Sequence, residues 1–289
     1  MDRIKSALID GYCAATWPWR ARFRKERARV AMAPVMVLFY HRVADINLNP
    51  WTITNDDFRR HLDWLQAHLD VVSLEEAQRR IASRYNTKSC VAITFDDGYS
   101  ENCDFAIGEL IRREMPATYF VTLENVLRGR PFPHDAELGI NAPPNTLPQI
   151  CEMAQSPWIE IGGHTRTHPD VGKMRDLLLL KDEVIFATEG LEQLIGKPIR
   201  YFAFPFGQHA NLNDTAINLL REKGIQGFCS AYGGYNFPGD DPYHIQRIHG
   251  DPDMARLRNW LTIDPRKVNG VPRYQPRYTK PVSPLGGSE

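Results

Sequence analysis

Short apolar runs alternate with amphipathic segments along most of the chain. The first run, V-M-V-L-F-Y at residues 35–40, is continuously hydrophobic, as in strands that are buried on both faces. The same pattern predicts further strands at residues 91–95, 117–122, 158–161, 200–204, 227–231 and 244–248. Strands that alternate with helices are joined in parallel by crossover connections. The pattern therefore predicts an α/β fold with a parallel sheet.

The intervals between these strands carry helical spacing. Apolar residues recur three or four positions apart after the first strand, at Phe58, Leu62, Leu65 and Leu69. Ser73 and Glu76 form a capping-box pattern that opens a second helix. Further helices are expected after residue 95 through Met115, up to about Gln155, and at residues 174–195, 214–223 and 254–261. About seven parallel strands joined in this way close naturally into a barrel, so we expect one domain.

Both ends of the chain differ from this central region. Residues 1–34 form a basic, aromatic leader that ends at Pro34. Residues 265–289 are rich in Pro, Arg, Tyr and Gly and lack periodicity, which predicts a loosely ordered tail. We therefore place the barrel at residues 35–264.

Charge and cysteine content indicate the cellular compartment and the kinds of binding partner. The formal net charge of the 289 residues is zero, so no charge excess recruits nucleic acid. The five cysteines are odd in number and include no C-x-x-C pair, which indicates thiols in a reducing compartment. Asp10 interrupts the one apolar segment that could begin a secretory signal, and no run reaches transmembrane length. We expect a cytoplasmic protein, with contact of residues 1–33 with the inner face of the membrane as an open alternative.

Candidate catalytic side chains follow the ends of predicted strands. Asp96 and Asp97 come directly after residues 91–95, and His164 and His168 follow the strand at 158–161. Adjacent carboxylates point in different directions, so one can bind a cation while the other faces a reacting water. Histidines four residues apart lie on one face of a helical turn and, with a carboxylate, suit a catalytic divalent cation. The plain alternatives are a helix-capping Asp-Asp-Gly turn and a chance pair of surface histidines.

The order of these motifs resembles a known family. The motifs are T-F-D-D-G at 94–98, H-T-R-T-H at 164–168, F-A-F-P-F-G at 202–207 and R-I-H at 247–249. Together they closely resemble the polysaccharide deacetylase domain, which is NodB-like and belongs to carbohydrate esterase family 4. The resemblance covers about residues 35–262. It implies a distorted (β/α) barrel that hydrolyses N-acetyl or O-acetyl groups on sugars with a divalent metal, commonly zinc.

The resemblance also implies a role for each motif residue. Three residues resemble the ligands of one divalent metal ion, expected to be Zn²⁺: Asp97, His164 and His168. Asp96 resembles the general base and His249 the general acid, while the backbone N–H of Phe206 resembles the donor to the developing oxyanion. These roles suit the chemistry, since zinc lowers the pKa of its water to about 7 and a histidine can protonate the leaving amine.

Two positions depart from the family pattern. Ala203 stands where the family often has an arginine that hydrogen-bonds the base, so the orientation of Asp96 lacks its usual partner. Phe206 stands in place of a tyrosine, which leaves a backbone donor intact.

Three further polar residues have structural explanations that compete with a functional one. We favour a hydrogen-bonded structural role for His41 and a surface or structural position for His134. Tyr99 either lines the sugar site or packs over the turn.

The expected function is metal-dependent removal of an N-linked acyl group, foremost acetyl, from an amino sugar in a polysaccharide or glycan precursor. The expected partner is therefore an acetylated amino-sugar glycan. Two alternatives stay open. The first is a non-catalytic carbohydrate-binding barrel that retains the metal, suggested by Ala203. The second is a deacylase or deformylase of a lipid- or nucleotide-linked sugar, suggested by the leader.

Overall fold

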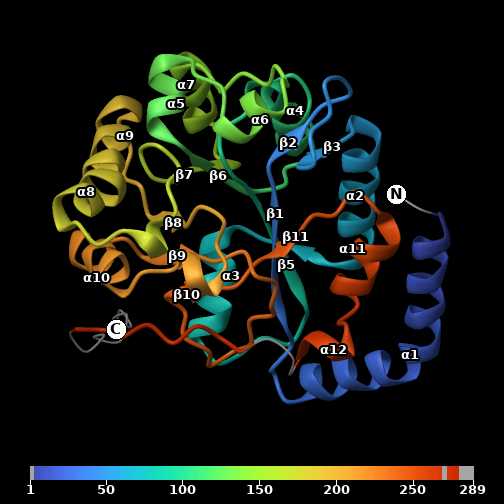
Figure 1. Cartoon of the computed structure of the whole chain (residues 1–289). Coiled ribbons are helices and arrows are strands. Elements are labelled where there is room, and N and C mark those ends of the chain that lie inside the picture. Colours follow the sequence, from blue (N-terminus) through green and yellow to red (C-terminus); the bar gives the residue numbers. More distant parts are fainter. Residues whose placement is uncertain (1–2, 269–271, 280–289) are drawn as a thin grey trace.

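A curled parallel sheet forms the centre of the computed structural model, which describes residues 3–268 and 272–279 (Figure 1). The strands of this sheet are β1 Val35–Tyr40, β4 Asp70–Val71, β5 Cys90–Phe95, β6 Ala117–Val121, β7 Ile159–Gly163, β8 Tyr201–Ala203, β9 Gly227–Cys229, β10 His244–Ile245 and β11 Ile248–His249. Their order is β10-β9-β8-β7-β6-β5-β1-β11, and β4 pairs with β5. All pairs in this sheet are parallel, as the alternation of strands and helices predicted.

One short segment reaches both ends of this strand order. β10 pairs with β9 and β11 pairs with β1, and only Gln246 and Arg247 lie between them. The single strand expected at residues 244–248 is therefore two short strands that serve different neighbours. This pairing curls the sheet into a half-barrel, which confirms the predicted single-domain, distorted (β/α) barrel.

The interior of the curled sheet is filled by alternate residues of its strands. All residues of β1 and β5 are buried, because these strands are covered on both faces. Strands far apart in the order share one apolar cluster, which also includes residues of α3 Leu74–Ala82. Its members include Val35, Val37, Ala92, Ala203, Cys229, Ala77 and Ile81. The opposite faces of the strands pack against the surrounding helices in a larger cluster.

Helices cover the outside of the sheet (Figure 1). They are α2 Asn55–His68, α4 Ala106–Arg112, α5 Leu123–Arg128, α6 Pro133–Glu137, α7 Leu147–Gln155, α8 Leu177–Lys181, α9 Ala187–Ile195, α10 Asp214–Lys223, α11 Met254–Leu261 and α12 Pro265–Val268. Short 3₁₀ turns occur at η1 Ser100–Cys103, η2 Val171–Lys173 and η4 His209–Asn211, and β2 Arg42–Val43 pairs with β3 Thr52–Ile53. The long helix expected at 174–195 is interrupted by a π-helical segment, η3 Asp182–Phe186.

Capping residues account for several of the helix starts. Ser73 accepts the N–H of Glu76, as expected, but Glu76 pairs with arginines instead of completing the capping box. Thr54 caps α2 by accepting the N–H of Asp57. Both hydroxyls satisfy an N–H group that the first helical turn leaves unpaired.

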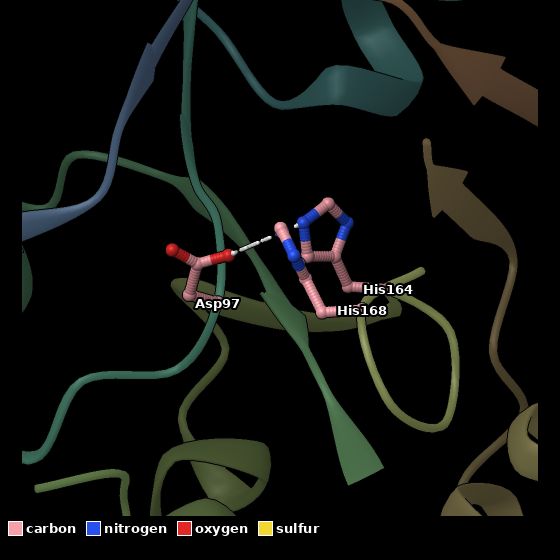
Figure 2. Close-up of side chains that lie close together, drawn as sticks. All are labelled: Asp97, His164 and His168. Carbon is pink, nitrogen blue, oxygen red and sulfur yellow. Dashed lines mark ion pairs between the residues drawn. The ribbon is translucent and has the colours of Figure 1, made fainter. Parts of the chain in front are cut away.

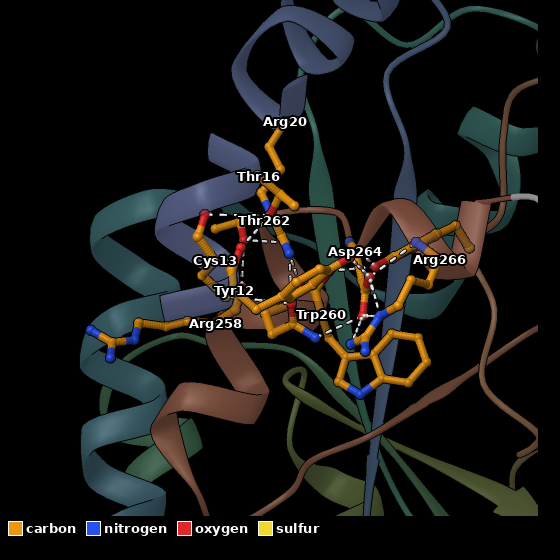
Figure 3. Close-up of polar contacts among 11 residues, drawn as sticks. Tyr12, Cys13, Thr16, Arg20, Arg258, Trp260, Thr262, Asp264 and Arg266 are labelled. Carbon is orange, nitrogen blue, oxygen red and sulfur yellow. Dashed lines mark hydrogen bonds and ion pairs between the residues drawn. The ribbon is translucent and has the colours of Figure 1, made fainter. Parts of the chain in front are cut away.

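The leader is a single helix, α1 Arg3–Arg29, that packs against α11 and α12 (Figure 3). Arg20 is fully buried and donates to the backbone and side-chain oxygens of Asn259 at 2.8 and 2.7 Å. Tyr12 donates to Asp264 at 2.9 Å. Figure 1 shows α1 bent along its length, and Pro18 lies within it, where it removes a helical hydrogen bond. These buried contacts make α1 part of the folded unit.

Residues 265–268 and 272–279 of the predicted tail contact the rest of the chain. Residues 265–268 form α12, and Arg273 donates to the backbone oxygen of Asp241 at 3.0 Å. Tyr274 donates to Asp214 at 2.8 Å. These contacts hold residues of 265–268 and 272–279 against the rest of the fold, and the remaining residues of the predicted tail lie outside the described part of the chain.

Among the described residues, no helix combines the length and the hydropathy that a membrane crossing requires.

Candidate metal centre

The carboxyl ends of the strands meet at one pocket, as parallel-barrel geometry requires. The pocket has a volume of about 330 Å³. Its lining includes all six site residues predicted from the sequence: Asp96, Asp97, His164, His168, Phe206 and His249.

Three of these residues form a compact set of candidate metal ligands (Figure 2). Asp97 follows β5, while His164 and His168 follow β7. The Oδ1 atom of Asp97 lies 3.4 Å from Nε2 of His164 and 3.2 Å from Nε2 of His168. The ligand atoms of all three residues lie within 4.8 Å of one another.

The loop that carries the two histidines is not the helical turn expected from their spacing. Residues 164–168 have no helical hydrogen bonding, and Thr165 and His168 have φ values of 68° and 63°. These left-handed conformations let the chain fold back so that both imidazoles face Asp97. The predicted convergence is present, but its geometry comes from a loop.

The arrangement of donor atoms fits a cation. Oδ1 of Asp97 is buried and makes no well-aligned hydrogen bond with the described residues. Nδ1 of His164 lies 2.7 Å from the carbonyl oxygen of Ala203, a contact that requires its N–H. The Nε2 lone pair of His164 therefore faces Asp97, as a metal ligand requires. A buried oxygen and a lone pair that face each other are satisfied by a positive ion between them.

The charges of the three ligands depend on one another. Burial alone would raise the pKa of Asp97, but His168 and His164 outweigh it and hold the pKa well below its usual range. Burial alone would lower the pKa of His168, but the Asp97 carboxylate outweighs it and raises the pKa. The pocket thus favours a carboxylate with positive charge beside it, which a divalent ion supplies more strongly than a proton.

The partner of Asp96 is an arginine that the sequence motifs did not indicate. Arg247 is fully buried, and its two terminal nitrogens donate to the two oxygens of Asp96 at 2.6 and 2.8 Å. Burial alone would raise the pKa of Asp96, but the Arg247 guanidinium outweighs it and lowers the pKa. The arginine that the family pattern places at position 203 is therefore replaced by one from the segment between β10 and β11.

A local pattern could have indicated this arginine. Arg247 stands two positions before His249, and side chains two apart in an extended segment point to the same side. If the His249 side chain faces the interior of the barrel, the Arg247 side chain is therefore expected to face it too.

Two further histidines, His249 and His41, line the pocket. His249 ends β11, and its ring centroid lies 5.2 Å from that of Phe39. Burial lowers the pKa of His249. The ring centroid of His41 lies 6.3 Å from that of His249, and burial lowers the pKa of His41 to about 4. Nδ1 of His41 has no hydrogen-bond partner in the described structure, so the hydrogen-bonded structural role we favoured for it is not observed.

The rim of the pocket is partly aromatic. Phe206 has a φ of 60° and an exposed ring whose centroid lies 5.1 Å from that of His168. His134 lines the pocket as well and lies 2.8 Å from the hydroxyl of Tyr99. Tyr99 is itself buried and donates to Asp135 at 2.7 Å, so it packs beneath the rim.

Comparisons with known proteins agree with this geometry. A sequence profile described as polysaccharide deacetylase matches residues 83–228. YxkH of Bacillus subtilis (strain 168), provisionally named as a polysaccharide deacetylase, is 23% identical over 225 residues, or 77% of this chain and 74% of YxkH.

Two solved structures are similar as well. IcaB from Ammonifex degensii has a TM-score of 0.66 and 26% identity, over 79% of this chain and 97% of IcaB. The Streptococcus pyogenes deacetylase PplD, solved in complex with acetate, has a TM-score of 0.65 and 21% identity, over 81% of this chain and 100% of PplD. The fold is thus shared over nearly the full length of both structures.

The profile spans about half of the chain and includes both the Asp-Asp-Gly turn and the histidine pair. The chain therefore belongs to the polysaccharide deacetylase family, the NodB-like domain of carbohydrate esterase family 4, and is a hydrolase with a His-His-Asp metal site.

Proposed function

We propose that this protein removes an N-linked acetyl group from an amino sugar within a polysaccharide or glycan precursor. One observation carries this proposal: the Asp97, His164 and His168 site shares its pocket with Asp96 and with His249, whose imidazole can carry a proton to a leaving amine. Hydrolysis of an amide needs a base for the water and an acid for the amine, and both are present beside the metal site.

The three ligands would hold a divalent ion, which supplies Lewis acidity to the acyl carbonyl and to the attacking water. Asp96 accepts a proton from this water, and Arg247 keeps its carboxylate ionised and oriented. The backbone N–H of Phe206 donates to the carbonyl oxygen as negative charge develops there. His249 donates a proton to the amine nitrogen as the C–N bond breaks, which releases acetate and the free amino sugar.

We propose Zn²⁺ as the ion. Two imidazoles and one carboxylate are a ligand set typical of catalytic zinc, with positions left for water and substrate. Metal analysis of the purified protein tests this choice, and a different resident ion would overturn it.

The Asp96→Asn variant tests the proposed function. The metal ligands are intact in this variant, so we expect full zinc content but loss of amine release from acetylated hexosamine oligomers. Asp56→Asn, a change at an exposed side chain of α2, is the matched control and should retain activity. Undiminished turnover in the Asp96 variant would reject the assigned base.

The Arg247 contact bears on the non-catalytic alternative. That alternative depended on the missing arginine at Ala203, and the Arg247 guanidinium provides Asp96 with an equivalent partner. We therefore favour an enzyme over a binding module. Glycan binding without any released acetate would favour the module instead.

The outward side of α1 supports a further proposal about location, namely contact with an anionic lipid surface on the cytoplasmic side. Leu8 is 69% exposed and Trp19 is 42% exposed, so α1 presents apolar and aromatic groups at its surface. Lys25 and Arg29 are exposed further along α1. Apolar and aromatic groups followed by cations suit the interface of an anionic membrane. All five cysteines are unpaired, which suits the reducing cytoplasm.

Co-sedimentation of the full chain with phosphatidylglycerol vesicles tests this location. Leu8→Glu should reduce binding, while Leu178→Glu on α8, at a residue that is 75% exposed, should not. Deletion of α1 is a poor test, because it would uncover the α11 surface that Arg20 contacts. Absence of binding by the wild-type chain, or equal binding by the Leu8 variant, would overturn the proposal and leave a lipid-linked substrate without support.

A further inference from the structure

The π-helical segment η3 brings an acidic side chain to the metal-ligand loop. It interrupts the long helix between α8 and α9 and spans Asp182–Phe186. Such segments widen one turn of a helix, redirect its side chains and occur frequently at functional sites. Glu183 lies in this segment and is only 8% exposed.

Both oxygens of the Glu183 carboxylate accept hydrogen bonds from the loop. Oε2 accepts the backbone N–H groups of Arg166 and Thr167, each at 2.9 Å. Oε1 accepts the hydroxyl of Thr167 at 2.6 Å. All three donors belong to the residues between His164 and His168. The neighbouring Asp182 adds an ion pair with Arg166 at 2.9 Å.

The loop needs such support because its backbone is strained. Thr165 and His168 both have positive φ values, which are unfavourable for residues with a Cβ. These conformations persist only where the surrounding structure determines them. The start of α5 holds the loop from another side, where Leu123 and Glu124 donate to the carbonyls of Thr165 and Arg166 at 3.2 and 2.8 Å. α5 thus satisfies loop carbonyls, and Glu183 satisfies loop N–H groups.

We propose that Glu183 is a positioning residue for the metal centre. Its carboxylate holds the loop in the conformation that aims the imidazole of His168 at Asp97. It touches neither the metal site nor the substrate pocket directly, and it acts through the backbone of Arg166 and Thr167. Loss of the carboxylate should therefore weaken metal binding before it weakens any later step.

Zinc affinity of Glu183→Gln, measured by competition with a chelating indicator, tests this proposal. The amide has the size of the carboxylate and keeps one oxygen for the loop N–H groups, but it loses the negative charge that strengthens these hydrogen bonds. Its NH₂ group also cannot accept the Thr167 hydroxyl. We expect a loss of zinc affinity of about 10- to 100-fold, the range typical of groups that orient metal ligands. Saturating zinc should restore kcat, with KM unchanged, because the substrate contacts are intact.

Glu192→Gln is the matched control. Glu192 lies on the same long helix, accepts the backbone N–H of Ile199 at 2.9 Å and is remote from the loop. Both variants are expected to lose some thermal stability, but only Glu183→Gln should lose zinc affinity. Wild-type zinc affinity in Glu183→Gln would overturn the proposal and leave Glu183 with a structural role only.

A second variant covers the case in which Glu183→Gln does not fold. Thr167→Val removes a single hydroxyl donor and should give a smaller loss of zinc affinity, whereas unchanged affinity would count against the proposal. The inference rests on the metal site of the proposed function, but zinc affinity needs no substrate. Failure of the proposed reaction and failure of this inference are therefore distinguishable.

Discussion

Replacement of Arg247 by methionine removes the only guanidinium that the described structure places on Asp96. Arg247 is fully buried and Asp96 is 3% exposed, and two short hydrogen bonds join them. Removal of one partner of a buried ion pair costs about 3–5 kcal/mol, because the other charge stays buried without compensation. The pocket opens beside Asp96, so we expect a loss of stability near the lower end, about 3 kcal/mol. Because the base also loses its orientation, kcat/KM for amine release should fall about 10- to 100-fold.

The pH dependence of kcat/KM provides the second readout for this variant. Arg247 favours the ionised form of Asp96, so its removal raises the pKa of Asp96. As the proposed base, Asp96 is active when ionised, and the acidic limb of the profile should therefore move to higher pH. Arg20→Met is the matched control, since Arg20 is as buried but contacts α11, and it should lower stability without moving this limb. A wild-type rate with an unmoved limb in the Arg247 variant would refute the reasoning.

Three further predictions concern His249, the metal and the carboxylate of Asp264. His249→Gln should reduce hydrolysis of an acetamide far more than that of an activated aryl acetate, whose leaving group needs no proton; equal losses on both substrates would argue against its role as the acid. Zinc at about 100 times its Kd should stabilise the wild-type fold by about 2.7 kcal/mol. A chelator should remove this stabilisation in a melting experiment. An equal stabilisation of Asp97→Asn by zinc would contradict the assignment of Asp97 as a ligand. The pKa of Asp264 is lowered to about 2, because Arg266 and Asn259 outweigh the effect of its burial. Asp264 should contribute about 2 kcal/mol to the free energy of unfolding above pH 4, and this contribution should be lost as the pH falls towards 2. Asp264→Asn should not show this loss of stability in an acid titration. Identical titration curves for the variant and the wild type would refute this prediction.

The metal ligands could be predicted because each belongs to a short local pattern. Asp96 and Asp97 follow a run of apolar residues that predicts a buried strand, and His164 and His168 follow another. Parallel strands bring such ends to one side of the sheet whatever the details of packing. Prediction was weaker where conformation depends on the surroundings, as in the loop at residues 164–168, whose left-handed residues were expected to form a helical turn.

The contacts of the leader and the tail also could not be predicted from the sequence. Their composition indicated a basic aromatic segment and a loosely ordered one. The buried contact of Arg20 with Asn259 and the bond of Tyr274 to Asp214 join segments 239 and 60 positions apart in the chain. Composition describes what a segment contains, but it does not reveal a distant partner that satisfies its polar groups.

The sequence by itself determined the class of fold, the order of strands and helices, and the residues that converge on the metal, because hydrophobic periodicity and strand-end position are local properties. Only the tertiary structure decided which groups hold those residues in place. Arg247 reaches Asp96 across 151 positions, and Glu183 reaches the histidine loop because a π-helical segment turns it there. Such contacts arise when buried charges and N–H groups must find partners in a packed interior, and the nearest partner in space is set by the fold as a whole.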